Sequence, residues 1–280
     1  MPELPEVETI MRGLEPVLVS ARFEHVSLKR SGLRYPFPED FVTRLENQTV
    51  LSVKRRAKYM LASLSSGEVL LIHLGMSGRF LVEREHFSSD ALERRHDHVI
   101  FHMSNGLTIS YRDPRRFGFM DICPLSGISE NRHLCNLGIE PLDDDLNGKL
   151  LMSLLQNKKM PLKTALLNQQ IIAGLGNIYV CEALHQSRLH PEKGAATLTE
   201  EEADRLVEKI KSVLRQALEA GGSTLKDYAQ TNGASGYFQH HFSVYGRENQ
   251  PCQTEGCSGF IYRITQNGRS TFLCARCQKK

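Results

Sequence analysis

The chain lacks several features that would have placed it in common classes of protein. It contains no tryptophan among its 280 residues, an absence from which nothing about function follows. No stretch approaches the roughly 18 consecutive apolar residues of a membrane-spanning helix, so we expect no membrane partner. The acidic amino terminus is not followed by an apolar run, so we expect a cytoplasmic protein without a secretory signal.

Cysteine is scarce, and its seven residues are an odd number. Cys123, Cys135 and Cys181 are scattered along the chain, which suits a reducing compartment better than a framework of disulfides. The other four cysteines gather near the carboxyl end, so this segment is the candidate for a metal site.

Neither sign of charge dominates, because the formal net charge is only +3 and the sequence pI is about 8.4. Nucleic acid is therefore permitted as a partner but not required. The cations are clustered at 54–58 (KRRAK), at 113–117 (DPRRF), and in the last thirty residues, where Glu255 is the single acid. Such clusters are typical of a surface that binds a phosphate backbone, although each one alone is equally consistent with a solvated surface.

The first residues, MPELPEVE, combine prolines with acids. Val7, Ile10, Met11 and Leu14 recur at helical spacing. Pro5 suits the first helical position, and Glu6 and Glu8 suit the positive end of the helix dipole. Helix formation leaves Pro2 unexplained.

Residues 22 to 120 alternate like strands. The sequence predicts one hairpin from 59–64 and 69–76, and a second from 98–103 and 107–113 with a tight turn at Asn105–Gly106. Beyond residue 150 the apolar spacing becomes helical, as in 162–173. Gly174 and Gly176 bend the chain before a helix restarts at Asn177, and such a bend can present backbone N–H groups to an anion.

A further helix begins at a capping box formed by Thr199 and Glu202 and ends at Gly221–Gly222. These patterns predict an α+β chain of several parts. The predicted parts are a β domain with a leading helix at 1–130, a linker at 131–150, a helical domain at 151–240 and a finger at 244–280.

Four cysteines flank a short predicted hairpin that turns at Asn267–Gly268; they are Cys252, Cys257, Cys274 and Cys277. This spacing favours one structural Zn²⁺ ion per chain, because four thiolate ligands leave no open position for a catalytic water. Two disulfides are the alternative that a reducing compartment disfavours. Arg269 directly follows the turn and is a candidate phosphate ligand, or else a solvated turn residue.

Eight short blocks follow one another along the chain. They are MPELPEVE, RRAKY (55–59), HLGMSG (73–78), DPRRFG (113–118), GLGNIY (174–179), GGSTLKDY (221–228), VYGR (244–247) and the cysteine finger. In this order, they make the whole chain resemble the formamidopyrimidine-DNA glycosylases. One departure is the first cysteine pair, which encloses four residues (253–256) where the family usually has two.

The resemblance implies an N-terminal β-sandwich with a leading helix, followed by a helix-two-turn-helix domain with a zinc-finger β-hairpin. It implies a bifunctional glycosylase and abasic-site lyase of base-excision repair, acting on 8-oxoguanine and formamidopyrimidines in damaged double-stranded DNA. We expect a nucleoid-associated monomer.

Pro2 has a chemical role in this family. Once Met1 is removed, its secondary amine can attack the sugar C1′, and the resulting iminium cannot lose a proton, so it drives β- and δ-elimination. By resemblance, Glu3 protonates the sugar ring oxygen, and Lys58 and Arg269 bind phosphates and assist the two eliminations.

The resemblance also assigns contacts with DNA. The residues at family positions for DNA contact are His73, His96, Arg115, Lys158, Lys163 and Asn177. Met76, Arg115 and Phe117 match the trio that fills the gap left by an extruded lesion. The loop at 221–240 is our candidate for reading the extruded base.

Two other functions remain open at this point. An endonuclease VIII-type enzyme has the same fold and nucleophile but prefers oxidised pyrimidines; Leu4 and the trio of Met76, Arg115 and Phe117 argue against it. A non-catalytic lesion-binding protein is the other alternative, which the presence of Pro2 and Glu3 disfavours.

Overall fold

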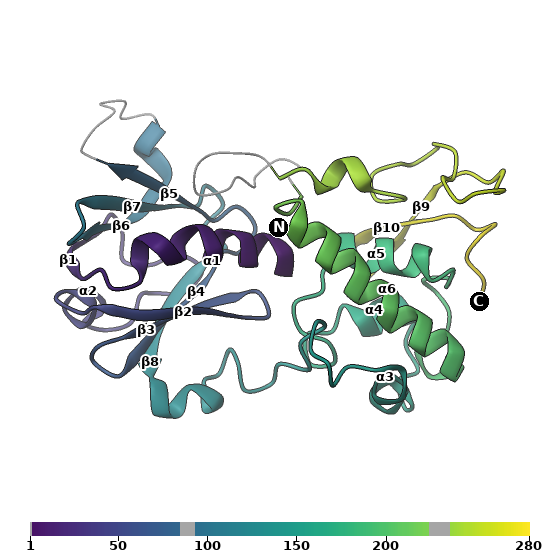
Figure 1. Cartoon of the computed structure of the whole chain (residues 1–280), viewed down its shortest axis with the longest axis horizontal. Helices are drawn as coiled ribbons and strands as arrows, with labels where there is room; N and C mark the ends of the chain where they lie inside the picture. Colours follow the sequence, from purple (N-terminus) through teal and green to yellow (C-terminus); the bar gives the residue numbers. More distant parts are fainter. Residues whose placement is uncertain (1, 85–92, 224–235) are drawn as a thin grey trace. The chain divides into compact units, whose positions relative to one another are not determined.

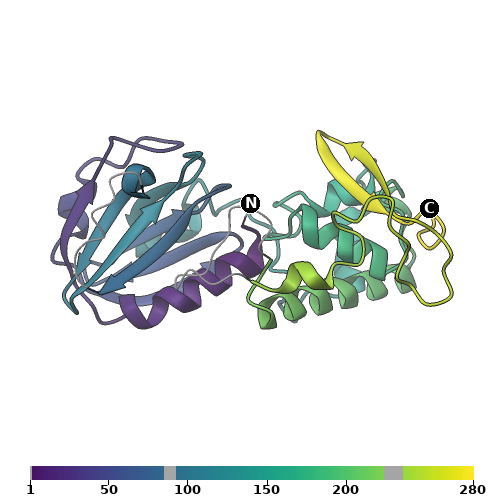
Figure 2. The same ribbon diagram turned by 90° about the horizontal axis from the view of Figure 1, so that it is seen from above.

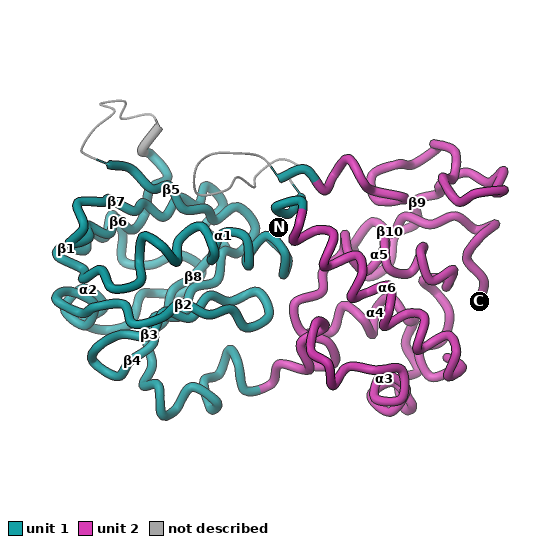
Figure 3. The backbone as a smooth tube through the Cα atoms, viewed as in Figure 1, with its two compact units in different colours: residues 1–135, 220–237 teal, residues 136–219, 238–280 magenta. Residues whose placement is uncertain are grey.

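The computed structural model describes residues 2–84, 93–223 and 236–280, and these form two compact units. Unit 1 comprises residues 1–135 and 220–237, and unit 2 comprises 136–219 and 238–280 (Figure 3). This division differs from the four predicted segments, because residues 220–237 belong to unit 1 and not to the predicted helical domain. The four predicted domain boundaries stay a prediction.

Unit 1 is the predicted β-sandwich with a leading helix. Its described residues form two four-stranded antiparallel sheets. One sheet has the order β1-β6-β7-β5, with β1 (Phe23–Leu28), β6 (Asp97–Met103), β7 (Leu107–Arg112) and β5 (Arg79–Arg84). The other has the order β2-β3-β4-β8, with β2 (Val50–Arg56), β3 (Tyr59–Leu64), β4 (Glu68–His73) and β8 (Phe119–Pro124).

Helical elements flank these sheets. The leading helix α1 (Leu4–Leu18) lies along one edge of the sandwich beside β2 and β3 (Figures 1 and 2). It begins one residue earlier than predicted, so Pro5 occupies its second position. The short elements of unit 1 are α2 (Phe41–Leu45), η1 (Glu93–His96) and η2 (Leu125–Glu130).

Both predicted hairpins of unit 1 are confirmed. β3 pairs with β4, and β6 pairs with β7. The second hairpin turns at Gly106, whose φ of +77° lies in the left-handed region that favours glycine.

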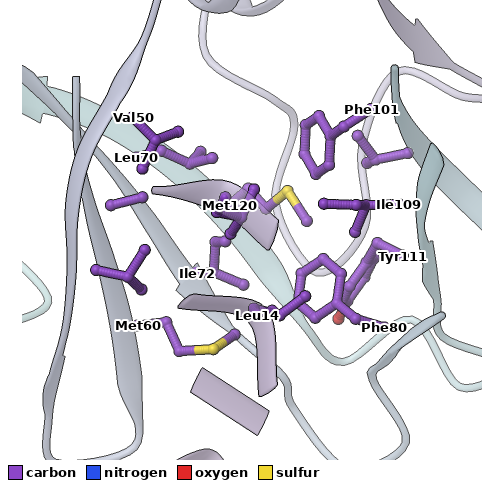
Figure 4. Packing of buried hydrophobic residues seen from close by; sticks show 14 of the residues in the cluster. Leu14, Val50, Met60, Leu70, Ile72, Phe80, Phe101, Ile109, Tyr111 and Met120 are labelled. Atoms are coloured by element: carbon purple, nitrogen blue, oxygen red, sulfur yellow. The ribbon is translucent and has the colours of Figure 1, made fainter. Parts of the chain in front are cut away.

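The two sheets are held together by apolar side chains that alternate along the strands. Met60 and Ile72 point from one sheet toward Phe80 and Ile109 of the other, and Leu14 of α1 joins them (Figure 4). All five are nearly inaccessible to solvent. Each buried aliphatic side chain of this size contributes about 1.5–3 kcal/mol to stability, so this core fixes α1 and the loops at the strand ends.

Unit 2 contains helices and a carboxyl-terminal hairpin, as predicted. Its described elements are α3 (Gly148–Leu155), α4 (Leu162–Leu166), α5 (Asn177–Gln186), η3 (Ala195–Thr197), α6 (Glu200–Glu219), η4 (Phe238–His241), β9 (Tyr262–Gln266) and β10 (Arg269–Leu273). The predicted capping box of α6 is confirmed: the Thr199 N–H donates to Glu202 Oε2 (3.0 Å), and the Glu202 N–H donates to Thr199 Oγ1 (3.2 Å).

The predicted helix over 162–173 is wrong in its length, because α4 ends at Leu166. The side chain of Gln169 competes with helical hydrogen bonds by accepting from the Gly174 N–H and donating to the carbonyls of Leu167 and Leu175. The apolar residues that follow pair with the linker, where Ile139 bonds to Ile171 and Ala173. Burial against another strand-like segment explains their apolar character.

The segment before the finger is fixed to α5 by one buried carboxylate. Glu182 is fully buried and accepts hydrogen bonds from the backbone N–H groups of Ser243, Val244 and Tyr245, at 2.8–3.0 Å. Burial raises the pKa of Glu182, and the three backbone donors oppose that effect. The carboxylate therefore anchors the VYGR segment.

Among the described residues, no helix combines the length and apolar character needed to span a bilayer.

Replacing Glu182 by Gln should lower the free energy of unfolding by about 2 kcal/mol, because an amide has one acceptor oxygen for three donors and turns an N–H₂ group toward them. Urea denaturation would measure this loss. Glu208→Gln on the exposed surface of α6 is the matched control and should change stability little. Equal stabilities of the two variants would contradict the anchoring role.

Candidate active site and metal centre

The start of α1 is enclosed rather than solvated. Pro2 is buried, and Glu3 and Glu6 are only 2% and 1% exposed. Glu3 is the N-cap of α1, and its backbone N–H donates to Glu6 Oε2 at 2.8 Å in a capping box. Residues 2 and 3 are thus held at the positive end of the helix dipole.

The second oxygen of Glu6 reaches a distant segment of unit 1. Glu6 Oε1 accepts from both the N–H (2.8 Å) and the hydroxyl (3.0 Å) of Ser223. Gly222 beside it has a φ of +80°, and a Cβ there would lie 3.1 Å from Glu6 Oε1. Because glycine has no Cβ, it allows this close approach, which explains the second glycine of the GGS sequence.

Lys58 lies in the two-residue turn between β2 and β3 and is buried. The preceding Ala57 has a φ of +53°. Arg55 holds this turn against α1, because its Nε donates to Glu8 Oε2 at 2.8 Å and its Nη1 donates to the Ala57 carbonyl at 3.0 Å. Lys58 is thereby fixed beside the first turns of α1.

His73 ends β4 opposite Tyr59 and stacks on Phe119, with ring centroids 5.3 Å apart. Burial, with smaller contributions from the charges of Lys58, Arg34 and His133, lowers the pKa of His73 to about 3. Its Nδ1 accepts from the Gly75 N–H at 3.1 Å. The neutral ring therefore carries its proton on Nε2, which makes that atom a hydrogen-bond donor.

The candidate insertion residues lie on two loops of unit 1. Met76 follows β4 and is half-buried, whereas Arg115 and Phe117 precede β8 and are exposed, Phe117 to 44%. The Arg115 guanidinium lies 5.0 Å from the centroid of the Phe117 ring, which is a cation–π geometry. His96 is half-buried at the end of η1.

In unit 2 the exposed Arg269 lies at the rim of a hollow of about 250 Å³ between α4 and the β9–β10 turn. Lys163 lines this hollow but is only 1% exposed, and its Nζ donates to Ser270 O (3.2 Å) and Thr271 Oγ1 (2.6 Å). Asn177 Nδ2 donates to the same Ser270 carbonyl at 2.8 Å. Both side chains therefore support the strand beside Arg269.

Lys158 is half-buried in the turn after α3, where its N–H donates to the Leu155 carbonyl. The candidate base-reading loop 221–240 lies largely outside the described residues, which omit 224–235. Sequence patterns did not single out Ser223, Asp113 or Glu182, because a hydrogen bond between distant residues produces no repeat at helix or strand spacing. Only their positions in or beside the GGS, DPRRFG and GLGNIY blocks could have drawn attention to them.

The four clustered cysteines form a cage at the base of the finger. Their Sγ atoms all lie within 4.8 Å of one another, with 3.7 Å between Cys252 and Cys277 and 3.8 Å between Cys257 and Cys274. Sulfur atoms bound to zinc at about 2.3 Å would stand about 3.8 Å apart in a regular tetrahedron. The cage therefore fits a tetrahedral metal ion, and the two additional residues of the first knuckle do not displace its ligands.

Cations outnumber acids in a hollow on one side of this cage. The hollow includes Cys257 and Cys277 and is lined by the cations Arg188, Arg205, Arg276 and Lys279 and by the acids Glu202 and Glu255. Four thiolates around a divalent ion carry a net charge of −2, which these cations partly offset.

Three family models match the chain. They describe the formamidopyrimidine-DNA glycosylase N-terminal domain (residues 1–120), the H2TH domain of the same enzymes (137–229) and a zinc finger found in FPG and IleRS (249–280).

Two relatives named formamidopyrimidine-DNA glycosylase align along the full length. The protein from Methylobacterium radiotolerans is 53% identical over 99% of both chains. The protein from Beijerinckia indica is 52% identical over 100% of both chains.

Solved structures agree with these relatives. The MutM (Fpg) protein of Thermus thermophilus is 37% identical, with a TM-score of 0.86 over 99% of this chain and 98% of that one. A mutant Fpg of Lactococcus lactis in complex with DNA containing Fapy-dG is 30% identical, with a TM-score of 0.90 over 100% of both chains. The Lactococcus lactis Fpg bound to abasic-site DNA has a TM-score of 0.89, also at 30% identity and full coverage.

Lowering the pH from about 6.5 toward 3 should destabilise unit 1, because the unfolded His73 takes up a proton that the folded ring binds only near its pKa of about 3. Above the pKa that His73 has in the unfolded chain, the full stability linked to this group is present. Below that pKa, the free energy of unfolding falls by at most about 1.4 kcal/mol per pH unit because of this group. Urea denaturation at pH 7 and pH 5 would measure the slope.

The His73→Gln variant keeps an acceptor for the Gly75 N–H without this titration, so its slope should be flatter. His25→Gln, at an exposed position, should keep the slope of the unmodified chain. A His73→Gln slope equal to that of the unmodified chain would show that His73 is not the group responsible.

Proposed function

The chain belongs to the formamidopyrimidine-DNA glycosylase family, and we propose that it excises oxidised purines from duplex DNA and then cleaves the strand at the abasic site. The substrates would be 8-oxoguanine and formamidopyrimidines. The enclosed start of α1 supports this proposal, because Pro2, Glu3 and Glu6 are all buried there. A buried secondary amine next to an acid is the pair that covalent deglycosylation requires.

In the first step, the Pro2 nitrogen freed by removal of Met1 attacks C1′ of the damaged nucleotide. A nitrogen–carbon bond forms as the bond from C1′ to the base breaks, and the base leaves with the electron pair. The Pro2 nitrogen loses its proton, and the departing base takes up one proton, so the step balances. Glu3 donates a proton to the ring oxygen as the sugar opens. The positive end of the α1 dipole favours the uncharged, nucleophilic amine.

The product is an iminium ion joining Pro2 to C1′. Because the amine is secondary, this ion keeps its charge and withdraws electrons from the sugar. Loss of a proton from C2′ then breaks the C3′–oxygen bond, and a second elimination breaks the C5′–oxygen bond. Lys58 and Arg269 would bind the departing phosphates. Lys58 would also supply a proton in the first elimination, and the fixed positive charge of Arg269 would stabilise the phosphate that leaves in the second.

The remaining candidates would hold the DNA. His73, through its Nε2 proton, His96, Lys158 and Asn177 would contact the backbone. Lys163 would contribute by supporting the strand next to Arg269, because its ammonium group already donates to Ser270 and Thr271.

The trio Met76, Arg115 and Phe117 would occupy the gap left by the extruded lesion. Phe117 suits a wedge between base steps, and the planar donors of Arg115 suit the unpaired cytosine. We further propose that the chain acts as a monomer on DNA in the cytoplasm.

The cysteine cage would hold one zinc ion with a structural role. Cys252, Cys257, Cys274 and Cys277 would ligate it, and its binding free energy would supply much of the folding free energy of the finger.

Borohydride should trap the processed chain covalently on a duplex containing 8-oxoguanine opposite cytosine, because reduction of the iminium fixes the Pro2 adduct. A form that retains Met1 should give no adduct, since its Pro2 nitrogen is in a peptide bond. Gel electrophoresis measures the yield, and Pro5→Ala on the same helix should trap like the unmodified chain.

An adduct of equal yield from the form that retains Met1 would exclude Pro2 as the nucleophile. A matched duplex carrying thymine glycol tests the substrate class. Faster cleavage of thymine glycol than of 8-oxoguanine would contradict the preference for purines and favour the endonuclease VIII-type function.

Elemental analysis should find about one zinc per chain, the occupancy expected of a closed four-thiolate site. Cys274→Ser should lose the metal and lower the melting temperature, whereas Cys135→Ser, at an exposed cysteine outside the cage, should keep both unchanged. Full zinc content in Cys274→Ser would contradict the assigned ligand set.

A further inference from the structure

A buried carboxylate joins the two loops that carry Met76, Arg115 and Phe117. Asp113 is completely buried. Its Oδ1 accepts from the Ser77 hydroxyl at 2.5 Å, and its Oδ2 accepts from the Gly118 N–H at 2.8 Å. One side chain therefore bonds the loop after β4 to both ends of the loop before β8.

Ser77 extends this connection to the exposed tip. It is 3% exposed, and its Oγ accepts from the Arg115 N–H at 3.1 Å while donating to Asp113. The Asp113 carbonyl accepts from the Arg116 N–H at 3.1 Å and contacts His98 Nε2 at 2.9 Å. The base of the loop is thus attached to β6 as well.

The backbones of the two loops are in close contact. A Cβ on Gly75 would collide with the Phe117 carbonyl carbon, and a Cβ on Gly118 would collide with the Tyr111 hydroxyl. Arg116 has a φ of +58°, a region that favours glycine. Hydrogen bonds from its neighbours hold this unfavourable conformation, so the loop has little freedom to rearrange.

The buried polar residues of these loops and their exposed residues have different roles. The hydrogen bonds of Asp113 and Ser77 face inward, whereas the Phe117 ring and the Arg115 guanidinium face solvent and contact each other. A wedge that is already ordered in the free protein loses less conformational entropy on insertion than a mobile one.

We propose that Asp113, acting through Ser77, is a positioning residue that presents Met76, Arg115 and Phe117 as one rigid wedge for opening the base stack. This inference rests on the proposed function. It predicts a specific defect: weakening the network should impair extrusion of a paired lesion and leave the chemistry at Pro2 intact.

The test compares one lesion in two contexts. The first substrate carries 8-oxoguanine paired with cytosine, and the second carries it in a one-nucleotide bulge, where less stacking and pairing must be broken. The variants are Ser77→Ala and Asp113→Asn. Ser110→Ala, at a comparably buried serine of β7, is the matched control, and thermal melting establishes that each variant is folded.

Ser77→Ala should lower kcat/KM about tenfold on the paired lesion, the factor that corresponds to one lost hydrogen bond, and much less on the bulged lesion. Asp113→Asn should show the same asymmetry more strongly, because it replaces one of the two acceptor oxygens with an N–H₂ group that faces a hydrogen-bond donor. Ser110→Ala should match the unmodified chain on both substrates. Borohydride trapping on a preformed abasic site should be equal for all folded variants.

Equal losses on the paired and bulged lesions, or unchanged rates in folded Ser77→Ala, would overturn the positioning role. If Asp113→Asn does not fold, Ser77→Ala alone decides the question. Failure of the unmodified chain to cleave either substrate would instead contradict the proposed function, so the two failures are distinguishable.

Discussion

The carboxylate of Glu6 fixes the first residues of the chain, because one oxygen accepts from the Glu3 N–H and the other accepts twice from Ser223. A chain terminus is ordinarily frayed, since few contacts offset the entropy of ordering it. Here one buried side chain bonds the start of α1 to a segment that comes much later in the sequence. The proposed chemistry at Pro2 depends on this bond, because a nucleophile must be held within reach of its target.

The same arrangement recurs elsewhere in the molecule. Glu182 anchors the VYGR segment, Asp113 joins the two wedge loops, and Lys163 supports the strand beside Arg269. In each case a buried polar group holds a segment from another part of the chain. For Asp113 and Lys163, exposed residues beside that segment, among them Phe117 and Arg269, are the candidates for contact with DNA. Burying such groups is favourable only when they are hydrogen-bonded, so each also makes its loop conformation specific.

Local sequence signals predicted most of the elements. Alternating strands around Asn105–Gly106, the Thr199–Glu202 capping box and the four cysteines depend on neighbours close in sequence or on ligand spacing, and the structure contains them all. The helix predicted through 173 was too long, because pairing of Ile171 and Ala173 with Ile139 outweighed helical propensity. That competition depends on a segment well outside the predicted helix.

The sequence by itself determined the family, the order of its parts and the identity of the candidate nucleophile and metal ligands, since these follow from motifs and spacing. Tertiary structure alone decided that Glu6 meets Ser223, that Asp113 meets Ser77, and that the ammonium group of Lys163 is buried against β10. The physical reason is that a hydrogen bond between distant residues imposes no periodicity on the chain. It is specified only when the packed core brings its two partners together.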